Sequence, residues 1–129
     1  MPRITFEYTD NLAIRDEIDA FIKNVHEDLV RIIQTDLSTC RTVIQRHEDY
    51  LIGDGDVKNA FIQLSIKMLP GRSNLIKNKL GTLLLDKINH QFSGKIQKLN
   101  TQVRVYLTEV DLTHYYGLPD AVKTRIGAL

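Results

Sequence analysis

Two strand-like segments of this chain are each followed by a helix-like segment, and this repeated order constrains the fold more than any other feature. Ile4, Phe6 and Tyr8 alternate with polar residues, which is the period of two typical of a half-buried strand. From Ile14 to Ile33 the apolar residues instead recur at spacings of three and four, which indicates an amphipathic helix of about five turns. The chain therefore begins with a strand and then a helix.

The middle of the chain predicts two more strands. Residues 40–52 are rich in β-branched side chains, and the Gly-Asp-Gly-Asp sequence at 53–56 supplies turn residues. Residues 60–68 alternate between apolar and polar again, and Pro70 and Gly71 end the pattern. We therefore expect a hairpin-like connection between the two halves of the chain.

The strand-then-helix pattern follows a second time. Ser73 is suited to cap a helix whose apolar residues run from Ile76 to Phe92 at helical spacing, and Gly94 is expected to close it. Residues 103–110 alternate as a last strand. Residues 112–129 have no clean period, and we interpret them as a C-terminal arm.

The order β-α-β followed by β-α-β predicts an internally duplicated α+β domain that spans residues 1–129. Each half joins two strands through a helix, which must pack back on the sheet by a right-handed crossover. Both helices then cover one face of a four-stranded sheet and leave the other face open. Because an open sheet face of that extent usually marks an interface, we expect an oligomer.

Charge and composition exclude several classes of function. The 17 basic and 16 acidic side chains leave a net charge of +1, and the basic residues are dispersed, so we expect neither nucleic-acid nor membrane binding. The single cysteine, Cys40, and the absence of a long apolar run favour the cytoplasm. The four histidines are scattered, so we expect no metal site and no other cofactor.

Three short motifs carry a resemblance to a known family. They are Met-Pro at the start, Glu-Tyr-Thr-Asp-Asn at 7–11, and Lys-Met-Leu-Pro-Gly-Arg-Ser at 67–73. Together, in an ungapped register from residue 1 to about residue 110, they resemble 5-carboxymethyl-2-hydroxymuconate Δ-isomerase of the tautomerase superfamily. The resemblance implies a tautomerase-like β-α-β-β-α-β fold with a four-stranded mixed sheet. It also implies a homotrimer, an active site at each amino-terminal proline, and a role in bacterial degradation of aromatic compounds.

The resemblance assigns catalytic roles to Pro2, Arg72 and Arg41. Without Met1, Pro2 would present a secondary amine, and an α-amino group has a reference pKa of about 7.7 to 8.0, close to that of an ideal general base in the cell. Arg72 matches the family's active-site arginine, and Arg41 falls on the family's other arginine. Each guanidinium would bind a substrate carboxylate and lower the pKa of Pro2. The implied reaction moves a proton along an unsaturated keto or enol di- or tricarboxylic acid without a cofactor.

Other interpretations of the same residues remain open. Proline is tolerated at the start of a strand, Arg72 is suited to a solvated turn, and Arg41 to a surface ion pair. Around His47, Gln45 and Arg46 stand where the family usually carries a His-Trp pair. The alternatives are a tautomerase or hydratase-like enzyme with another unsaturated acid as substrate, and a catalytically silent trimeric scaffold or dicarboxylate-binding protein of the same fold.

Overall fold

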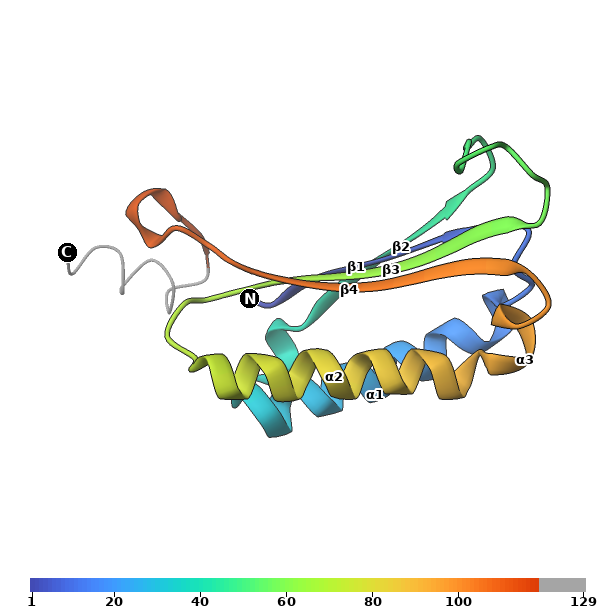
Figure 1. The fold of residues 1–129 in the computed structure, drawn as a ribbon. Helices are drawn as coiled ribbons and strands as arrows, with labels where there is room; N and C mark the ends of the chain where they lie inside the picture. The colour runs from blue at the N-terminus through green and yellow to red at the C-terminus, as the bar shows by residue number, and fades with distance from the viewer. Residues whose placement is uncertain (119–129) are drawn as a thin grey trace.

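The structure is a computed structural model, and it describes residues 1–118 of the chain. Four strands form one sheet, and the two long helices lie on the same face of it (Figure 1). The strands are β1 (Arg3–Thr9), β2 (Arg41–His47), β3 (Asn59–Met68) and β4 (Asn100–Glu109). The helices are α1 (Arg15–Ile33), α2 (Asn74–Gln91) and the short α3 (Ser93–Ile96), with 3₁₀ turns η1 (Leu37–Thr39) and η2 (Leu112–His114).

The sheet has the strand order β2-β1-β3-β4 and is mixed. β1 pairs with β2 in parallel, β3 pairs with β4 in parallel, and the two central strands β1 and β3 are antiparallel. Each half of the chain is therefore one β-α-β unit, and the two units meet at the centre of the sheet. This arrangement confirms the predicted fold class, but the expected hairpin-like connection between the halves is wrong, because β1 lies between β2 and β3.

The core lies between the sheet and the two long helices. In β1 and β3 every second side chain is buried, as the alternating sequence predicts, and the buried apolar residues of α1 and α2 face them. Phe6, Phe21 and Phe92 form an aromatic cluster with ring centroids 5.2 to 6.1 Å apart. Burial of each such ring stabilises the fold by about 1.5–3 kcal/mol.

Two strand boundaries differ from the prediction because a strand extends only as far as its partner. β2 was expected to reach Ile52 but ends at His47, because its partner β1 ends at Thr9, which pairs with His47. β4 begins earlier than predicted, at Asn100, because that residue pairs with Asn59 at the start of β3.

The second long helix has the predicted start and a different end. The Ser73 hydroxyl accepts a hydrogen bond of 3.2 Å from the backbone N–H of Ile76, which confirms the predicted cap. The prediction that Gly94 closes the helix is wrong, because α2 ends at Gln91 and Gly94 lies within α3. Of the expected C-terminal arm, η2 lies within the described part, and residues 119–129 lie outside the described residues.

Candidate active site

The predicted site residues Pro2, Arg41 and Arg72 all lie at the same end of the sheet. β1 and β2 begin there, and β3 and β4 finish there, because the outer strands run parallel to their neighbours and the central pair is antiparallel. The last turn of α1 and the first turn of α2 reach the same end, which is on the left in Figure 1. We call this the Pro2 end and the opposite end of the sheet the far end.

Pro2 is buried at the start of β1. Its carbonyl oxygen accepts a hydrogen bond of 3.3 Å from the backbone N–H of Arg41, which extends the ladder between β1 and β2 by one step. In the chain as described, Met1 is bonded to the proline nitrogen. Burial first, and then the positive charge of Arg41, lower the pKa of the Met1 amine, while Cys40 opposes this shift. The environment at this end of the chain therefore favours a neutral amine.

The connection between α1 and β2 wraps around the first residue. Gln34, the C-cap residue that follows α1, adopts the left-handed conformation with φ of 54° and so turns the chain toward the Pro2 end. The hydroxyl oxygens of Thr35 and Thr39 both lie 3.1 Å from the Met1 carbonyl oxygen. Two hydroxyl groups therefore surround the position next to the Pro2 nitrogen.

Arg41 is the first residue of β2 and its side chain is exposed. Within residues 1–118 its guanidinium makes no ion pair, although its charge is close enough to lower the pKa of the terminal amine. The expectation of a surface ion pair therefore does not describe Arg41 here. An arginine without a carboxylate partner is suited to bind an anion that arrives from solution.

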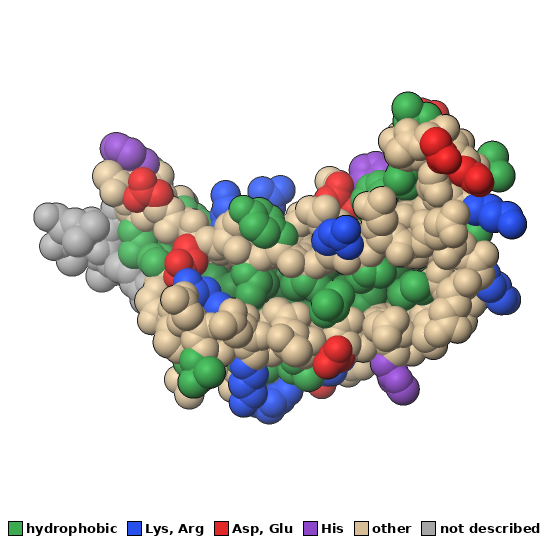
Figure 2. All heavy atoms as spheres, in the orientation of Figure 1, with side chains coloured by type: hydrophobic (Ala, Val, Ile, Leu, Met, Phe, Trp, Pro, Cys, Tyr) green, Lys and Arg blue, Asp and Glu red, His purple; other side chains and the backbone are tan. Residues whose placement is uncertain are grey.

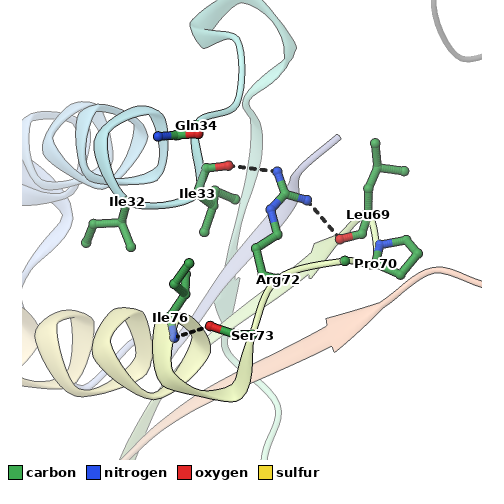
Figure 3. A pocket seen from close by; sticks show the side chains of 9 residues that line it. Ile32, Ile33, Gln34, Leu69, Pro70, Arg72, Ser73 and Ile76 are labelled. Carbon is green, nitrogen blue, oxygen red and sulfur yellow. Dashed lines mark hydrogen bonds between the residues drawn. The ribbon is translucent and has the colours of Figure 1, made fainter.

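Arg72 lies in the connection between β3 and α2 and joins it to α1. Its guanidinium donates hydrogen bonds of 2.9 Å to the carbonyl oxygen of Leu69 and 2.8 Å to that of Ile33, the last residue of α1 (Figure 3). A carbonyl in the last turn of a helix lacks an intrahelical partner, and arginine supplies the donor. Both partners are neutral, and the remaining N–H groups can still bind a carboxylate.

A glycine and a glutamate hold this connection in place. Gly71 has φ of 118°, a conformation that side chains with a Cβ rarely adopt, which explains why glycine precedes Arg72. One carboxylate oxygen of Glu109 accepts from the Gly71 N–H at 3.3 Å, and the other lies 3.2 Å from the ammonium nitrogen of Lys77. The end of β4 therefore fixes the backbone next to Arg72.

A pocket of about 630 Å³ lies between the end of α1 and the 69–73 connection. Its walls combine apolar Ile32, Ile76 and Leu69 with Arg72, whose guanidinium lies between the two backbone segments (Figure 3). Pro2 and Arg41 do not line this pocket. The segment that links the two regions is short, because Arg72 binds the carbonyl of Ile33 while Thr35, two residues later, contacts Met1.

The structure thus brings Pro2 and Arg41 together directly and places Arg72 on the neighbouring connection. Among the described residues, no group of three or more His, Cys, Asp or Glu side chains is arranged to hold a metal ion. No helix of residues 1–118 combines the length and the apolar composition that a membrane span requires.

Comparison with known proteins identifies the family. The family model for 5-carboxymethyl-2-hydroxymuconate isomerase matches residues 2–118, which is most of the chain. The chain belongs to the 5-carboxymethyl-2-hydroxymuconate isomerase family. The match includes Pro2, Arg41 and Arg72, and family membership confirms the resemblance that the three sequence motifs indicated.

Solved structures show that this isomerase family member has the tautomerase fold. A 5-carboxymethyl-2-hydroxymuconate isomerase from Deinococcus radiodurans R1 is 21% identical, with a TM-score of 0.84 over 96% of this chain and 92% of that chain. A 5-carboxymethyl-2-hydroxymuconate delta-isomerase is 16% identical, with a TM-score of 0.78 over 97% and 92%. A fused 4-OT wild-type symmetric trimer is 17% identical, with a TM-score of 0.74 over 97% and 98%. A search of curated protein sequences finds no match.

Sequence reasoning missed two residues of this candidate site, Thr35 and Glu109. Thr35 follows the last turn of α1 and belongs to no periodic pattern, so its contact with Met1 becomes visible only in three dimensions. Glu109 had a usable signal. Because β3 and β4 are parallel, their last residues meet, and Glu109 pairs with Met68 shortly before Gly71.

Proposed function

We propose that this protein is a cofactor-independent isomerase that moves a proton along an unsaturated keto or enol di- or tricarboxylic acid. The general base is the amine of Pro2, which becomes available when Met1 is removed. The observation that carries the proposal is the burial of Pro2 beside Arg41, which makes no ion pair within residues 1–118, in surroundings that lower the pKa of the Met1 amine. Family membership supports the same class of reaction.

The surroundings that lower the pKa of the Met1 amine would act in the same direction on a free Pro2 amine, which would suit it to act as both base and acid. A free α-amino group has a reference pKa of about 7.7 to 8.0, and a lower value leaves most of the amine unprotonated at neutral pH. In the proposed reaction the nitrogen lone pair takes the proton of the substrate's enol hydroxyl. The electrons of the O–H bond form the carbonyl, the conjugated double bonds shift, and the terminal carbon takes the same proton back from the proline ammonium. All atoms and charges balance without a cofactor.

The two arginines supply the positive charge that this reaction requires. Arg41 is near the amine and has no carboxylate partner among the described residues, so it is suited to bind a substrate carboxylate next to Pro2. Arg72 faces a pocket with apolar walls that is suited to a carbon chain ending in a carboxylate. Both charges also stabilise the enolate that forms between the two proton transfers.

We further propose that the protein works as a homotrimer. β2 and β4 are edge strands of the sheet and present unpaired backbone groups. A groove of about 660 Å³ runs between β4 and α2, and hydrophobic side chains are exposed along this side of the molecule (Figure 2). The similar fold of a symmetric trimer supports this assembly. Family membership supports a role in bacterial degradation of aromatic compounds, and the single free Cys40 supports a location in the cytoplasm.

The Pro2→Ala variant tests the proposal. Alanine leaves a primary amine that is not fixed by a ring, and we expect the rate of ketonisation of 5-carboxymethyl-2-hydroxymuconate to fall about 10²- to 10⁴-fold, the usual contribution of a general base. The reaction is followed by ultraviolet absorbance, with intact mass confirming that Met1 is absent from both proteins. An unchanged rate in the Met1-free variant would refute the proposed chemistry.

A dicarboxylate-binding protein without turnover is the second candidate. With Met1 attached, the Pro2 nitrogen is an amide and has no basic lone pair, while Arg41 and Arg72 still present positive charge. Binding of a dicarboxylate without turnover, retained in Pro2→Ala and lost in Arg72→Ala, would favour this function. Isothermal titration with 5-carboxymethyl-2-hydroxymuconate, with the product analysed afterwards, separates the two candidates.

A further inference from the structure

We propose that the hydroxyl of Thr35 is a catalytic group that donates a hydrogen bond to the substrate oxygen from which Pro2 removes the proton. This inference rests on the proposed function and names the part of the substrate that the site holds next to the amine. It is carried by the position of the Met1 carbonyl group and by the hydrogen bonds of the α1–β2 connection.

The Met1 carbonyl marks the place of a substrate oxygen. It is bonded to the Pro2 nitrogen, and standard bond lengths place its oxygen about 2.2 Å from that nitrogen. The hydroxyl oxygen of Thr35 lies 3.1 Å from the same carbonyl oxygen. Removal of Met1 vacates this space on the side of the nitrogen that then carries the lone pair. An enol oxygen that gives its proton to the amine lies about 2.5–3.0 Å from it, within reach of Thr35.

The neighbouring Thr39 has a different role although it is equally close. Its hydroxyl oxygen lies 3.1 Å from the Met1 carbonyl oxygen but only 2.7 Å from the carbonyl oxygen of Asp36. A hydroxyl has one proton to donate, and the shorter contact takes it. Thr39 therefore closes the turn that begins at Asp36, whose own carboxylate accepts from the Ser38 N–H. Thr35 has no closer acceptor than the Met1 carbonyl in the described residues.

The position of Thr35 suits an oxygen whose negative charge grows during the reaction. When Pro2 takes the proton, the enol oxygen gains charge until the carbonyl forms, so a fixed donor binds it more strongly in the transition state than in the ground state. The backbone of Thr35 follows the left-handed Gln34, and the adjacent carbonyl of Ile33 is held by Arg72. The donor is thus positioned by the same arginine that faces the pocket.

The variant Thr35→Val tests the inference because valine keeps the branched shape and removes only the hydroxyl. With 5-carboxymethyl-2-hydroxymuconate as substrate, we expect kcat to fall at least about tenfold while KM changes less than about threefold, since the bond strengthens in the transition state. Thr35→Ser restores the hydroxyl and should return kcat to within about threefold of the unmodified protein. Thr39→Val is the matched control and should retain kcat within the same range.

Four results would overturn the inference. The first two are an unchanged kcat in Thr35→Val and a kcat in Thr35→Ser as low as in Thr35→Val. The other two are a rise in KM of Thr35→Val that exceeds its fall in kcat, and a fall in kcat of Thr39→Val equal to that of Thr35→Val. If the valine variant does not fold, Thr35→Ala takes its place with the same expected loss. Pro2→Ala is measured in parallel. If Pro2→Ala loses activity and Thr35→Val does not, only this inference fails, whereas full activity of Pro2→Ala refutes the proposed function itself.

Discussion

The two ends of the sheet are related by the internal duplication, yet they satisfy their polar groups in different ways. At the far end the side-chain amide of Asn11 donates to the backbone carbonyls of Val57 and Asn59, at 3.3 and 2.8 Å. The Lys95 ammonium there lies 3.6 Å from the carboxylate of Glu17. Backbone carbonyls and a carboxylate thus satisfy the side chains of Asn11 and Lys95 at the far end.

At the Pro2 end the corresponding groups are left available. Arg41 makes no ion pair within the described residues, and Arg72 binds only neutral carbonyl oxygens. The ion pair between Lys77 and Glu109 lies to one side, where Glu109 holds the backbone of Gly71. The two β-α-β units therefore form a common scaffold, and the end that carries Pro2, Arg41 and Arg72 is the one at which we propose the active site.

The largest expected difference between the ends comes from removing one cation at each. Arg72→Ala removes two hydrogen bonds to carbonyl oxygens and a charge that faces the pocket, so we expect kcat/KM to fall about 100-fold or more. Lys95→Ala also removes a hydrogen bond to a carbonyl, that of Ala13, and should leave kcat/KM within about twofold. Steady-state kinetics compares the two variants. Equal losses would end the distinction between the two ends.

A smaller effect is expected in the pH dependence of Arg41→Gln. Pro2 acts as a base only when unprotonated, so kcat/KM falls as the pH drops through the amine pKa. Burial and the charge of Arg41 lower the pKa of the terminal amine, and removal of that charge raises it. The acid limb of the profile should therefore move to higher pH, by up to about one unit, which is about tenfold in rate below it.

The matched control for that shift is an exposed arginine at the far end. Arg46 pairs with Glu48 at 2.7 Å, and Arg46→Gln should leave the acid limb in place. The pH profiles of kcat/KM for the two variants are measured in the same buffers. A shift of the limb to lower pH in Arg41→Gln, or an equal shift in both variants, would contradict the account.

The smallest expected effect on activity comes from Asn11→Ala. The variant loses both hydrogen bonds to the carbonyls of Val57 and Asn59, and we expect a free energy of unfolding lower by about 1–2 kcal/mol. Because the change lies at the far end, kcat/KM at a temperature where the protein is folded should be unchanged. Urea unfolding measures the stability, with Asn24→Ala on the exposed face of α1 as control. A large loss of activity without loss of stability would place function at the far end as well.

The fold could be predicted from the sequence because burial on one face sets the spacing of apolar residues in each strand and helix. The alternation around Ile62 and the helical spacing from Ile18 onward predict β3 and α1 with the right buried faces. The strand ends were less accessible, because β2 stops where Thr9 of β1 stops, and composition does not encode where a partner ends. Helix ends are equally hard to predict, because Gly94 lies within α3 and a glycine alone does not show whether a helix ends there.

The candidate site could be predicted only from its sequence motifs. Gly71 and Arg72 stand in a motif, and the structure gives a physical reason for each. Gly71 adopts a positive φ, and Arg72 donates a hydrogen bond to the last carbonyl of α1. Thr35 contacts a residue that precedes it by 34 positions, and such a contact depends on how the α1–β2 connection folds around the terminus. Pattern analysis detects residues that repeat, whereas the site uses residues that interrupt the repetition.

The most direct test of the central claim compares the protein with and without Met1. Each form is verified by intact mass, and the ketonisation of 5-carboxymethyl-2-hydroxymuconate is then measured under the same conditions. The account predicts turnover by the form that begins at Pro2 and a rate at least about 100-fold lower for the form that keeps Met1, because an amide nitrogen is not a base. Equal rates from the two forms would contradict the role of the Pro2 amine.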